Sequence, residues 1–136
     1  MPGTEIHKPK ILIVDGELGI LKLLAYGLAI YGLEVLTADN SGKAVEMYEC
    51  FRSEIELVLL DVPKLRRDGI QTLIDLQRID PIIPVAFMSA TPLDLTTTEL
   101  LGLGVVRVIP KPFQSLKHLA EILKELIEKR NQTDGR

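Results

Sequence analysis

The first aliphatic run of the chain, ILIVDGELG at residues 11–19, decides how the rest of the sequence is interpreted. Four consecutive aliphatic residues, Ile11–Val14, lead directly to Asp15, and Gly16 follows. A short aliphatic run without alternating polar residues is typical of a strand that is covered on both faces, as in a parallel sheet. A charge directly after such a run lies at the carboxyl end of the strand, where α/β proteins place their functional groups.

Four more runs of this kind follow and alternate with segments of helical spacing. The runs are Glu34–Thr37, Leu57–Leu60, Ile82–Met88 and Val105–Ile109. Apolar residues three and four positions apart predict helices that begin near Leu18, after Asn40 or Ser41, near Ile70, at Leu93 (ending at Leu101) and at Leu116. Five strands that alternate with five helices predict an α/β fold with a doubly wound parallel sheet.

Composition narrows the class of protein. The chain has 136 residues, the length of one domain that can bury a core of its own. Its 16 Lys and Arg and 19 Asp and Glu give a net charge of −3, which argues against direct binding of nucleic acid. A single cysteine, Cys50, excludes an internal disulfide and fits a reducing, cytoplasmic compartment. No apolar stretch approaches the roughly 20 residues that cross a bilayer, so we expect no membrane contact.

Polar side chains follow four of the five predicted strands: Asp15, Asp61, Ser89 and Lys111. The carboxyl ends of parallel strands share one edge of the sheet, so we expect the four to converge. A carboxylate can accept a phosphoryl group, and Mg²⁺ held by one or two carboxylates offsets the charge on that group. A hydroxyl and an ammonium can hold the phosphoryl oxygens. The set therefore favours phosphoryl transfer.

Each of these residues also has an ordinary structural interpretation. Asp15 and Asp61 are placed where an acid caps the helix that follows a strand. A hydroxyl at a strand end, as in Ser89, usually bonds the backbone, and Lys111 lies between two prolines, where it could be a surface lysine without a function. The prediction of a site therefore rests on the four residues together.

Four motifs at these strand ends resemble the receiver domains of bacterial two-component response regulators. ILIVDGE resembles the motif of strand one, and LVLLD, with Asp68-Gly69 downstream, resembles the phosphoacceptor strand. MSA at residues 88–90 and PKPF at 110–113 resemble the switch-hydroxyl and Lys-Pro-Phe motifs. The resemblance covers about residues 10–129. It implies a receiver domain at 10–130, a leader at 1–9, and a frayed tail or the start of a linker at 131–136.

The resemblance also implies a detailed fold and a site. The fold would be flavodoxin-like, a five-stranded sheet of order 2-1-3-4-5 with five helices and a cis peptide before Pro112. Asp61 would be the phosphoacceptor, assisted by Ser89 and Lys111. Asp15, Asp61 and the backbone carbonyl of Pro63 would hold Mg²⁺.

The function that the resemblance implies is a signalling switch in a phosphorelay. A sensor histidine kinase or a phosphotransfer protein would phosphorylate Asp61, and the domain would catalyse at most its own phosphorylation and dephosphorylation. A homodimer through the fourth helix, fifth strand and last helix is left open.

An alternative is a degenerate receiver that serves as a phosphorylation-independent interaction module. An aspartyl phosphatase of the haloacid type is a weaker third interpretation, because position 63 is Pro where that class has a second Asp.

Several positions depart from the family pattern. Gly16 stands where the family usually has a second acid that contacts the metal, so we expect weaker Mg²⁺ binding. Glu17 either reaches inward as a substitute or pairs with the dipole of the first helix. Val108 stands where many members carry an aromatic residue that swings inward on phosphorylation. The basic cluster of Lys64, Arg66 and Arg67 is interpreted as a solvated loop.

Overall fold

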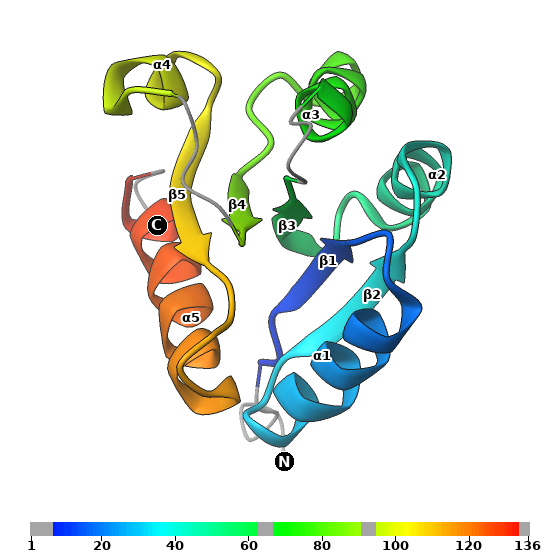
Figure 1. Cartoon of the computed structure of the whole chain (residues 1–136), viewed down its shortest axis with the longest axis vertical. Helices are drawn as coiled ribbons and strands as arrows, with labels where there is room; N and C mark the ends of the chain where they lie inside the picture. Colours follow the sequence, from blue (N-terminus) through cyan, green and yellow to red (C-terminus); the bar gives the residue numbers. More distant parts are fainter. Residues whose placement is uncertain (1–6, 63–66, 91–94, 134–136) are drawn as a thin grey trace.

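The computed structural model describes residues 7–62, 67–90 and 95–133 (Figure 1). Strands and helices alternate strictly along these ranges. The strands are β1 (Lys10–Val14), β2 (Glu34–Ala38), β3 (Ile55–Asp61), β4 (Val85–Ser89) and β5 (Val105–Pro110), and the helices are α1 (Leu18–Ile30), α2 (Ser41–Phe51), α3 (Arg67–Ile79), α4 (Thr97–Gly102) and α5 (Leu116–Thr133). All neighbouring strands pair in parallel, in the order β2-β1-β3-β4-β5, which confirms the predicted fold and topology.

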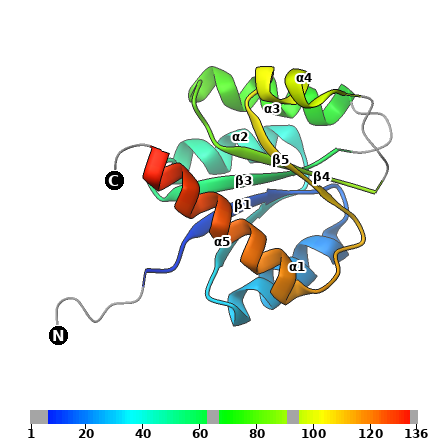
Figure 2. The ribbon, with the colours of Figure 1, turned by 90° about the vertical axis from the view of Figure 1, so that its left-hand side faces the viewer.

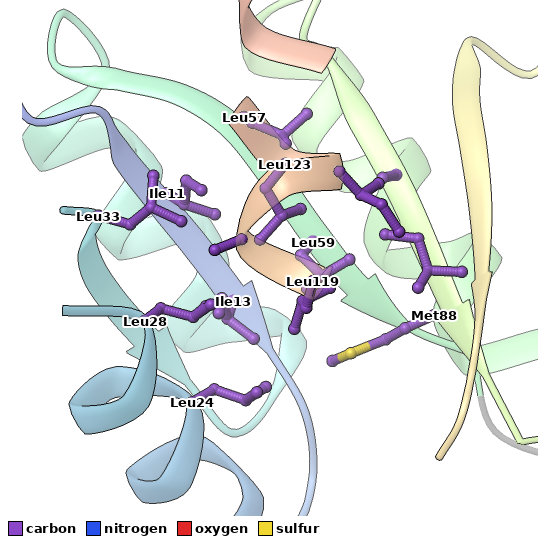
Figure 3. Close-up of a cluster of buried hydrophobic side chains, with 14 of the residues drawn as sticks. Ile11, Ile13, Leu24, Leu28, Leu33, Leu57, Leu59, Met88, Leu119 and Leu123 are labelled. Carbon is purple, nitrogen blue, oxygen red and sulfur yellow. The ribbon is translucent and has the colours of Figure 1, made fainter. Parts of the chain in front are cut away.

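Two layers of helices cover the sheet. Figure 2 shows α1 and α5 on one side and α2, α3 and α4 on the other. Alternate residues of β1 supply the two cores: Ile11 and Ile13 pack with α1 and α5, whereas Leu12 and Val14 face the side of α2 and α3. Figure 3 shows the first of these cores, between α1, α5 and the sheet. Strands buried on both faces explain the aliphatic runs in the sequence.

Local signals set the ends of several helices. The side chain of Asn40 accepts a hydrogen bond of 2.9 Å from the backbone N–H of Lys43 and caps α2, one of the two predicted caps. Gly32 and Gly104 adopt φ angles of +87° and +84° in the turns that follow α1 and α4. The peptide bond between Lys111 and Pro112 is cis, as the resemblance implied.

The fourth helix begins later than predicted. The sequence placed it at Leu93–Leu101, but α4 starts at Thr97, and residues 91–94 lie outside the described residues. Thr96 is its N-cap, and Thr96 and Glu99 form a capping box, with both hydrogen bonds at 3.1 Å. Threonine is a poor helix former within a helix, yet here Thr96 is the residue that starts one.

The fourth strand and the last helix also differ from their predicted bounds. The backbone N–H groups of Ile82 and Ile83 bond to Asp80, so the chain turns there and β4 begins only at Val85. The last helix continues to Thr133, so residues 131–133 are helical, although the sequence assigned them to a frayed tail. No Pro or Gly interrupts it before Gly135, and a helix that is docked through its apolar side propagates without a new nucleation cost.

A hydrogen bond joins α3 and α4, the helices that precede and follow β4 in the chain. Gln77 of α3 donates from Nε2 to the backbone carbonyl of Leu103, directly after α4, at 2.6 Å. A Cβ added at Gly104 would lie 3.0 Å from the same Nε2, so glycine gives the amide room to approach. The carboxyl end of α4 is thus fixed to α3.

Candidate functional site

The fold brings the four predicted residues to one edge of the sheet. Asp15 directly follows β1, Asp61 ends β3, Ser89 ends β4 and Lys111 follows β5. Backbone pairing aligns the ends of β3, β4 and β5. The N–H of Lys111 donates to the carbonyl of Ser89 at 2.8 Å, and Asp61 is in register with Met88. The alignment follows from the parallel order, in which every strand ends at the same edge.

Lys111 joins the two carboxylates. Its Nζ donates to Oδ2 of Asp15 and to Oδ1 of Asp61, each at 3.0 Å. The side chain of Asp15 is only 1% exposed, whereas those of Asp61 and Lys111 are 19% and 15% exposed. Asp61 is therefore the carboxylate of this group that a ligand can reach from solvent.

The protonation of this group reflects both burial and charge. Burial raises the pKa of the Asp61 carboxyl above its ordinary value; the hydrogen bond from Lys111 opposes this, and the charges of Asp15 and Glu17 raise the pKa further. Burial lowers the pKa of Lys111, but the hydrogen bonds to Asp61 and Asp15 outweigh it and leave that pKa raised. We conclude that Lys111 is charged at neutral pH and that ionised Asp61 carries an energetic cost.

Asp15 also organises the start of α1. Its Oδ1 accepts the backbone N–H of Glu17 at 2.9 Å, while its other oxygen accepts Lys111. Asp15 is therefore a strand-end acid of the site whose second oxygen forms a local turn just before α1, and it does not cap the helix itself. Glu17 is the N-cap residue of α1 and makes no side-chain capping bond.

A cleft of about 400 Å³ lies beside Asp61 and extends toward α2 and α3. Its lining includes Asp15, Gly16, Asn40 and Thr72. A Cβ built on Gly16 meets no atom within 4 Å, so the glycine leaves this side of the cleft open. Thr72 was not predicted, because a hydroxyl within an amphipathic helix carries no signal in the sequence.

The donor set can be compared with the needs of a divalent cation. Within the described parts of the chain, no group of three or more acidic, His or Cys side chains lies close enough to share a metal ion. Asp15 and Asp61 remain as two carboxylates beside an open cleft, and Mg²⁺ binds with one or two carboxylates when waters complete its shell. Asp15 and Asp61 therefore fit Mg²⁺, which would have two carboxylate ligands here instead of three. The predicted ligand Pro63 and the basic residues Lys64 and Arg66 lie outside the described residues.

The first turn of α3 packs closely on the strand that carries Asp61. A Cβ on Gly69 would lie 3.1 Å from Cγ2 and 3.2 Å from Cα of Val62, and 3.3 Å from the backbone oxygen of Asp61. A side chain at this position would push α3 away from the strand. Gly69 belongs to the Asp-Gly motif of the sequence, and the structure gives a physical reason for the glycine.

A larger hollow of about 900 Å³ lies at the opposite, amino-terminal end of the strands. Side chains of its lining pair with one another: Lys10 with Glu54 at 2.7 Å, and the ring of His7 hydrogen-bonds Glu56 at 2.7 Å. It is far from Asp61 along the strands, and several of its charged side chains already pair with one another. We therefore place the functional site at the carboxyl edge despite the larger volume here.

Comparison with known proteins identifies the family. The family model described as "Response regulator receiver domain" matches residues 11–126. The chain belongs to this family. Among the described residues of this receiver domain, no helix is both long and apolar enough to cross a membrane.

The relatives of this receiver domain are regulators. It is 32% identical over 113 residues to the transcriptional regulatory protein CpxR homolog of Haemophilus influenzae, covering 83% of this chain and 48% of that protein. It thus spans about half the length of that curated relative. NtrX from Brucella abortus is similar in structure, with 28% identity and a TM-score of 0.78, over 96% of this chain and 30% of that one.

A second similar structure contains ligands. It is the CheX-CheY-BeF₃-Mg²⁺ complex from Borrelia burgdorferi, with 27% identity and a TM-score of 0.72, covering 85% of this chain and 87% of that one. That protein was solved with a beryllium fluoride group and Mg²⁺.

Proposed function

We propose that this receiver domain is a phosphorylation-controlled switch with Asp61 as its acceptor. The observation that carries the proposal is the contact of one ammonium, Lys111 Nζ, with two carboxylates at 3.0 Å, at the edge where parallel strands end. Asp61 is the more exposed of the two carboxylates and opens onto the cleft. These features give an accessible nucleophile beside a fixed positive charge.

The chemistry requires few groups. A carboxylate oxygen of Asp61 attacks phosphorus, an O–P bond forms, and the bond from phosphorus to the donor breaks with its electron pair leaving on the donor. With a phosphohistidine the leaving atom is an imidazole nitrogen, and with acetyl phosphate it is an acetate oxygen. Lys111 stabilises the phosphoryl oxygens, and the Ser89 hydroxyl bonds one of them.

Asp15 and Asp61, with the carbonyl of Pro63, would hold Mg²⁺ in this cleft. The cation supplies neutralisation of the charge on the phosphoryl oxygens. Because no third acidic side chain among the described residues lies close enough to share the ion, binding should be weaker than with three. This feature also favours the alternative function, an interaction module that works without phosphorylation.

An adduct assay separates the two functions. The chain is incubated with acetyl phosphate and Mg²⁺, and its intact mass is measured. We expect one acid-labile phosphoryl group on the wild type and none on Asp61→Asn. Absence of an adduct on a wild-type sample that is shown to be folded by circular dichroism would reject the switch and support the interaction module.

Restoring an acid at position 16 should tighten Mg²⁺ binding. Gly16→Asp adds a carboxylate where nothing lies within 4 Å of a built Cβ, so the side chain fits. We expect the dissociation constant for Mg²⁺, measured by calorimetric titration, to fall about tenfold, which corresponds to roughly 1.4 kcal/mol. Gly16→Asn is the control of equal size and should change binding little. Equal constants for Gly16→Asp and the wild type would reject the missing acid as the limit on affinity.

The remaining proposals concern context. We propose a sensor histidine kinase or a phosphotransfer protein as the phosphodonor, and no direct contact with nucleic acid or membrane by this domain. An exposed free thiol at Cys50 fits a reducing, cytoplasmic compartment. We propose residues 10–130 as the receiver unit. A homodimer through α4, β5 and α5 stays a prediction.

A further inference from the structure

A groove of about 530 Å³ lies at the amino-terminal ends of β4 and β5, at the opposite end of the sheet from Asp61. Three segments line it: the turn that leads into β4, the start of β5, and the last turns of α5. Figure 1 shows β5 beside α5. The volume is in the range of pockets that bind small organic molecules. The groove therefore has room for a ligand that takes no part in the chemistry of Asp61.

Most of the lining is apolar. Leu57 and Leu126 contribute buried side chains, whereas Ile82 and Val106 are 78% and 50% exposed to solvent. These exposed aliphatic side chains come from two separate segments of the chain but line the same groove. A ligand with an apolar body would remove both of them from water, which is favourable.

The turn before β4 is already fixed in place. The carboxylate of Asp80 accepts hydrogen bonds from the backbone N–H of Ile82 at 3.2 Å and from the hydroxyl of Tyr48 at 2.6 Å. Pro81 and Pro84 further restrict the backbone on either side of the exposed isoleucine. A wall that is ordered before binding loses little conformational entropy when a ligand binds.

The charged side chains of the groove are all positive. Among the described residues, its lining contains Arg107 of β5 and Lys129 and Arg130 of α5, and no acidic residue. Lys129 already pairs with Glu125 at 3.1 Å. The guanidinium groups of Arg107 and Arg130 make no hydrogen bond or ion pair with any residue that the structure describes. Their donors are therefore available to a carboxylate, which guanidinium groups bind through paired hydrogen bonds.

The apolar walls and the unpaired arginines together select the chemistry of the occupant. An uncharged apolar compound would leave the guanidinium groups unmatched, and a small inorganic anion would not contact the aliphatic side chains. We propose that the groove binds a small organic carboxylate with an apolar body, either aromatic or aliphatic. Binding involves neither Asp61 nor Mg²⁺, so it does not depend on the proposed function.

Titration of the isotope-labelled whole chain with phenylbutyrate, followed by amide NMR spectra, tests the proposal. The amides of Ile82, Val106, Arg107 and the last turns of α5 should shift and saturate. We expect a dissociation constant on the order of 0.1–1 mM for a ligand of this size. Octanoate, which carries its carboxylate on an aliphatic chain, is titrated in parallel. Saturable binding of either compound at these amides supports the proposal, and the tighter one identifies the apolar body that fits.

Two further compounds separate the charge of the ligand from its apolar body. Phenylbutanol has the aromatic body without the carboxylate, and acetate has the carboxylate without an apolar body. Each should bind about tenfold more weakly than phenylbutyrate, because each makes only one of the two kinds of contact.

Arg107→Gln should raise the dissociation constant for phenylbutyrate about tenfold, since it removes a guanidinium and leaves the apolar walls intact. Lys117→Gln is the matched control. It also removes one positive charge from an exposed side chain, but Lys117 lies in the first turn of α5, outside the groove. This variant should bind like the wild type, and both should keep wild-type circular dichroism spectra.

Ile82→Ser tests the apolar wall and should raise the dissociation constant about fivefold, because it removes aliphatic surface that the ligand covers. Its control is Leu101→Ser. Leu101 is 65% exposed on α4 and does not line the groove, so this variant should bind like the wild type.

Four results would overturn the proposal. The first is the absence of saturable shifts at the amides of the groove with either carboxylate. The second is equal binding of phenylbutanol or acetate, which would reject combined recognition of charge and apolar body. The third is an equal loss with Lys117→Gln and Arg107→Gln, which would indicate a general effect of charge. The fourth is a shift of the same amides with protein concentration alone, which would make a second copy of the chain the occupant.

Discussion

Replacing Lys111 with methionine should slow formation of the phosphoryl adduct on Asp61 about 100-fold, the usual cost of removing one preorganised group that stabilises charge in a transition state. The Nζ of Lys111 lies 3.0 Å from Oδ1 of Asp61, where oxygens of an incoming phosphoryl group would lie. Methionine keeps much of the length of the side chain and removes only its charge and donors. The rate is measured by intact mass over time, with acetyl phosphate and Mg²⁺.

Lys129→Met is a suitable control, because the side chain of Lys129 is 67% exposed on α5, away from the edge of the sheet that carries Asp61. Its rate should equal that of the wild type. Both variants should have wild-type circular dichroism spectra. A rate for Lys111→Met within threefold of the wild type would show that the ammonium does not take part in the transfer.

Asp61→Asn should be more stable than the wild type at pH 7, by about 1 kcal/mol, the usual scale of a single substitution. The pKa of Asp61 is raised in the folded chain, chiefly by burial, so folding disfavours the ionised form. The fold therefore loses stability as the pH rises from the ordinary pKa of aspartate through this raised pKa. Below the ordinary pKa of aspartate, about 3.9, the carboxyl is neutral in both states and the loss disappears.

Urea denaturation at a series of pH values, in a buffer with a chelator, tests this expectation. The advantage of Asp61→Asn should grow as the pH rises toward 7 and should vanish only well below the ordinary aspartate pKa of about 3.9. Asp39→Asn is the control, since Asp39 is an exposed acid of the same cleft and should show no such advantage. A wild type that is more stable than Asp61→Asn at pH 7 would mean that the bond to Lys111 outweighs the burial of the charge.

Much of the fold could be predicted because its strands are buried on both faces. Short aliphatic runs such as Ile11–Val14, with Asp and Gly directly after them, favour buried strands, and their order with the helices restricts the topology. Bounds were less predictable where side chains bond the backbone. The turn at Asp80 shortened the fourth strand, and the cap at Thr96 moved the fourth helix. Such hydrogen bonds depend on where a side chain lies in space, which the helix and strand propensities of single residues do not describe.

The location of the site was predictable, and its internal contacts were not. Four polar residues after four strands must share an edge, and the backbone places Asp15, Asp61, Ser89 and Lys111 there. The sequence could not show that one ammonium contacts both carboxylates, because that depends on the conformation of a long side chain. The roles of these residues remain predictions until the adduct is measured.

The first helix shows a limit of pattern reasoning. Its leucines indicated a helix correctly, and Leu18 was included among the residues of its apolar pattern, yet Leu18 is 60% exposed. A helix with apolar residues on every side has no polar face to show which side turns outward. Only the position of α1 on the sheet distinguishes its buried residues from its exposed ones.

The hydrogen bond from Gln77 to Leu103 has a mechanical consequence for α4. A hydrogen bond directly after the last turn of this six-residue helix opposes sliding of α4 along α3 and favours pivoting about its carboxyl end. Its amino end is the end that leads back along the chain toward Ser89, at the edge of the sheet that carries Asp61. A displacement of the chain at this end would therefore rotate α4 about its carboxyl end, where the hydrogen bond holds it to α3.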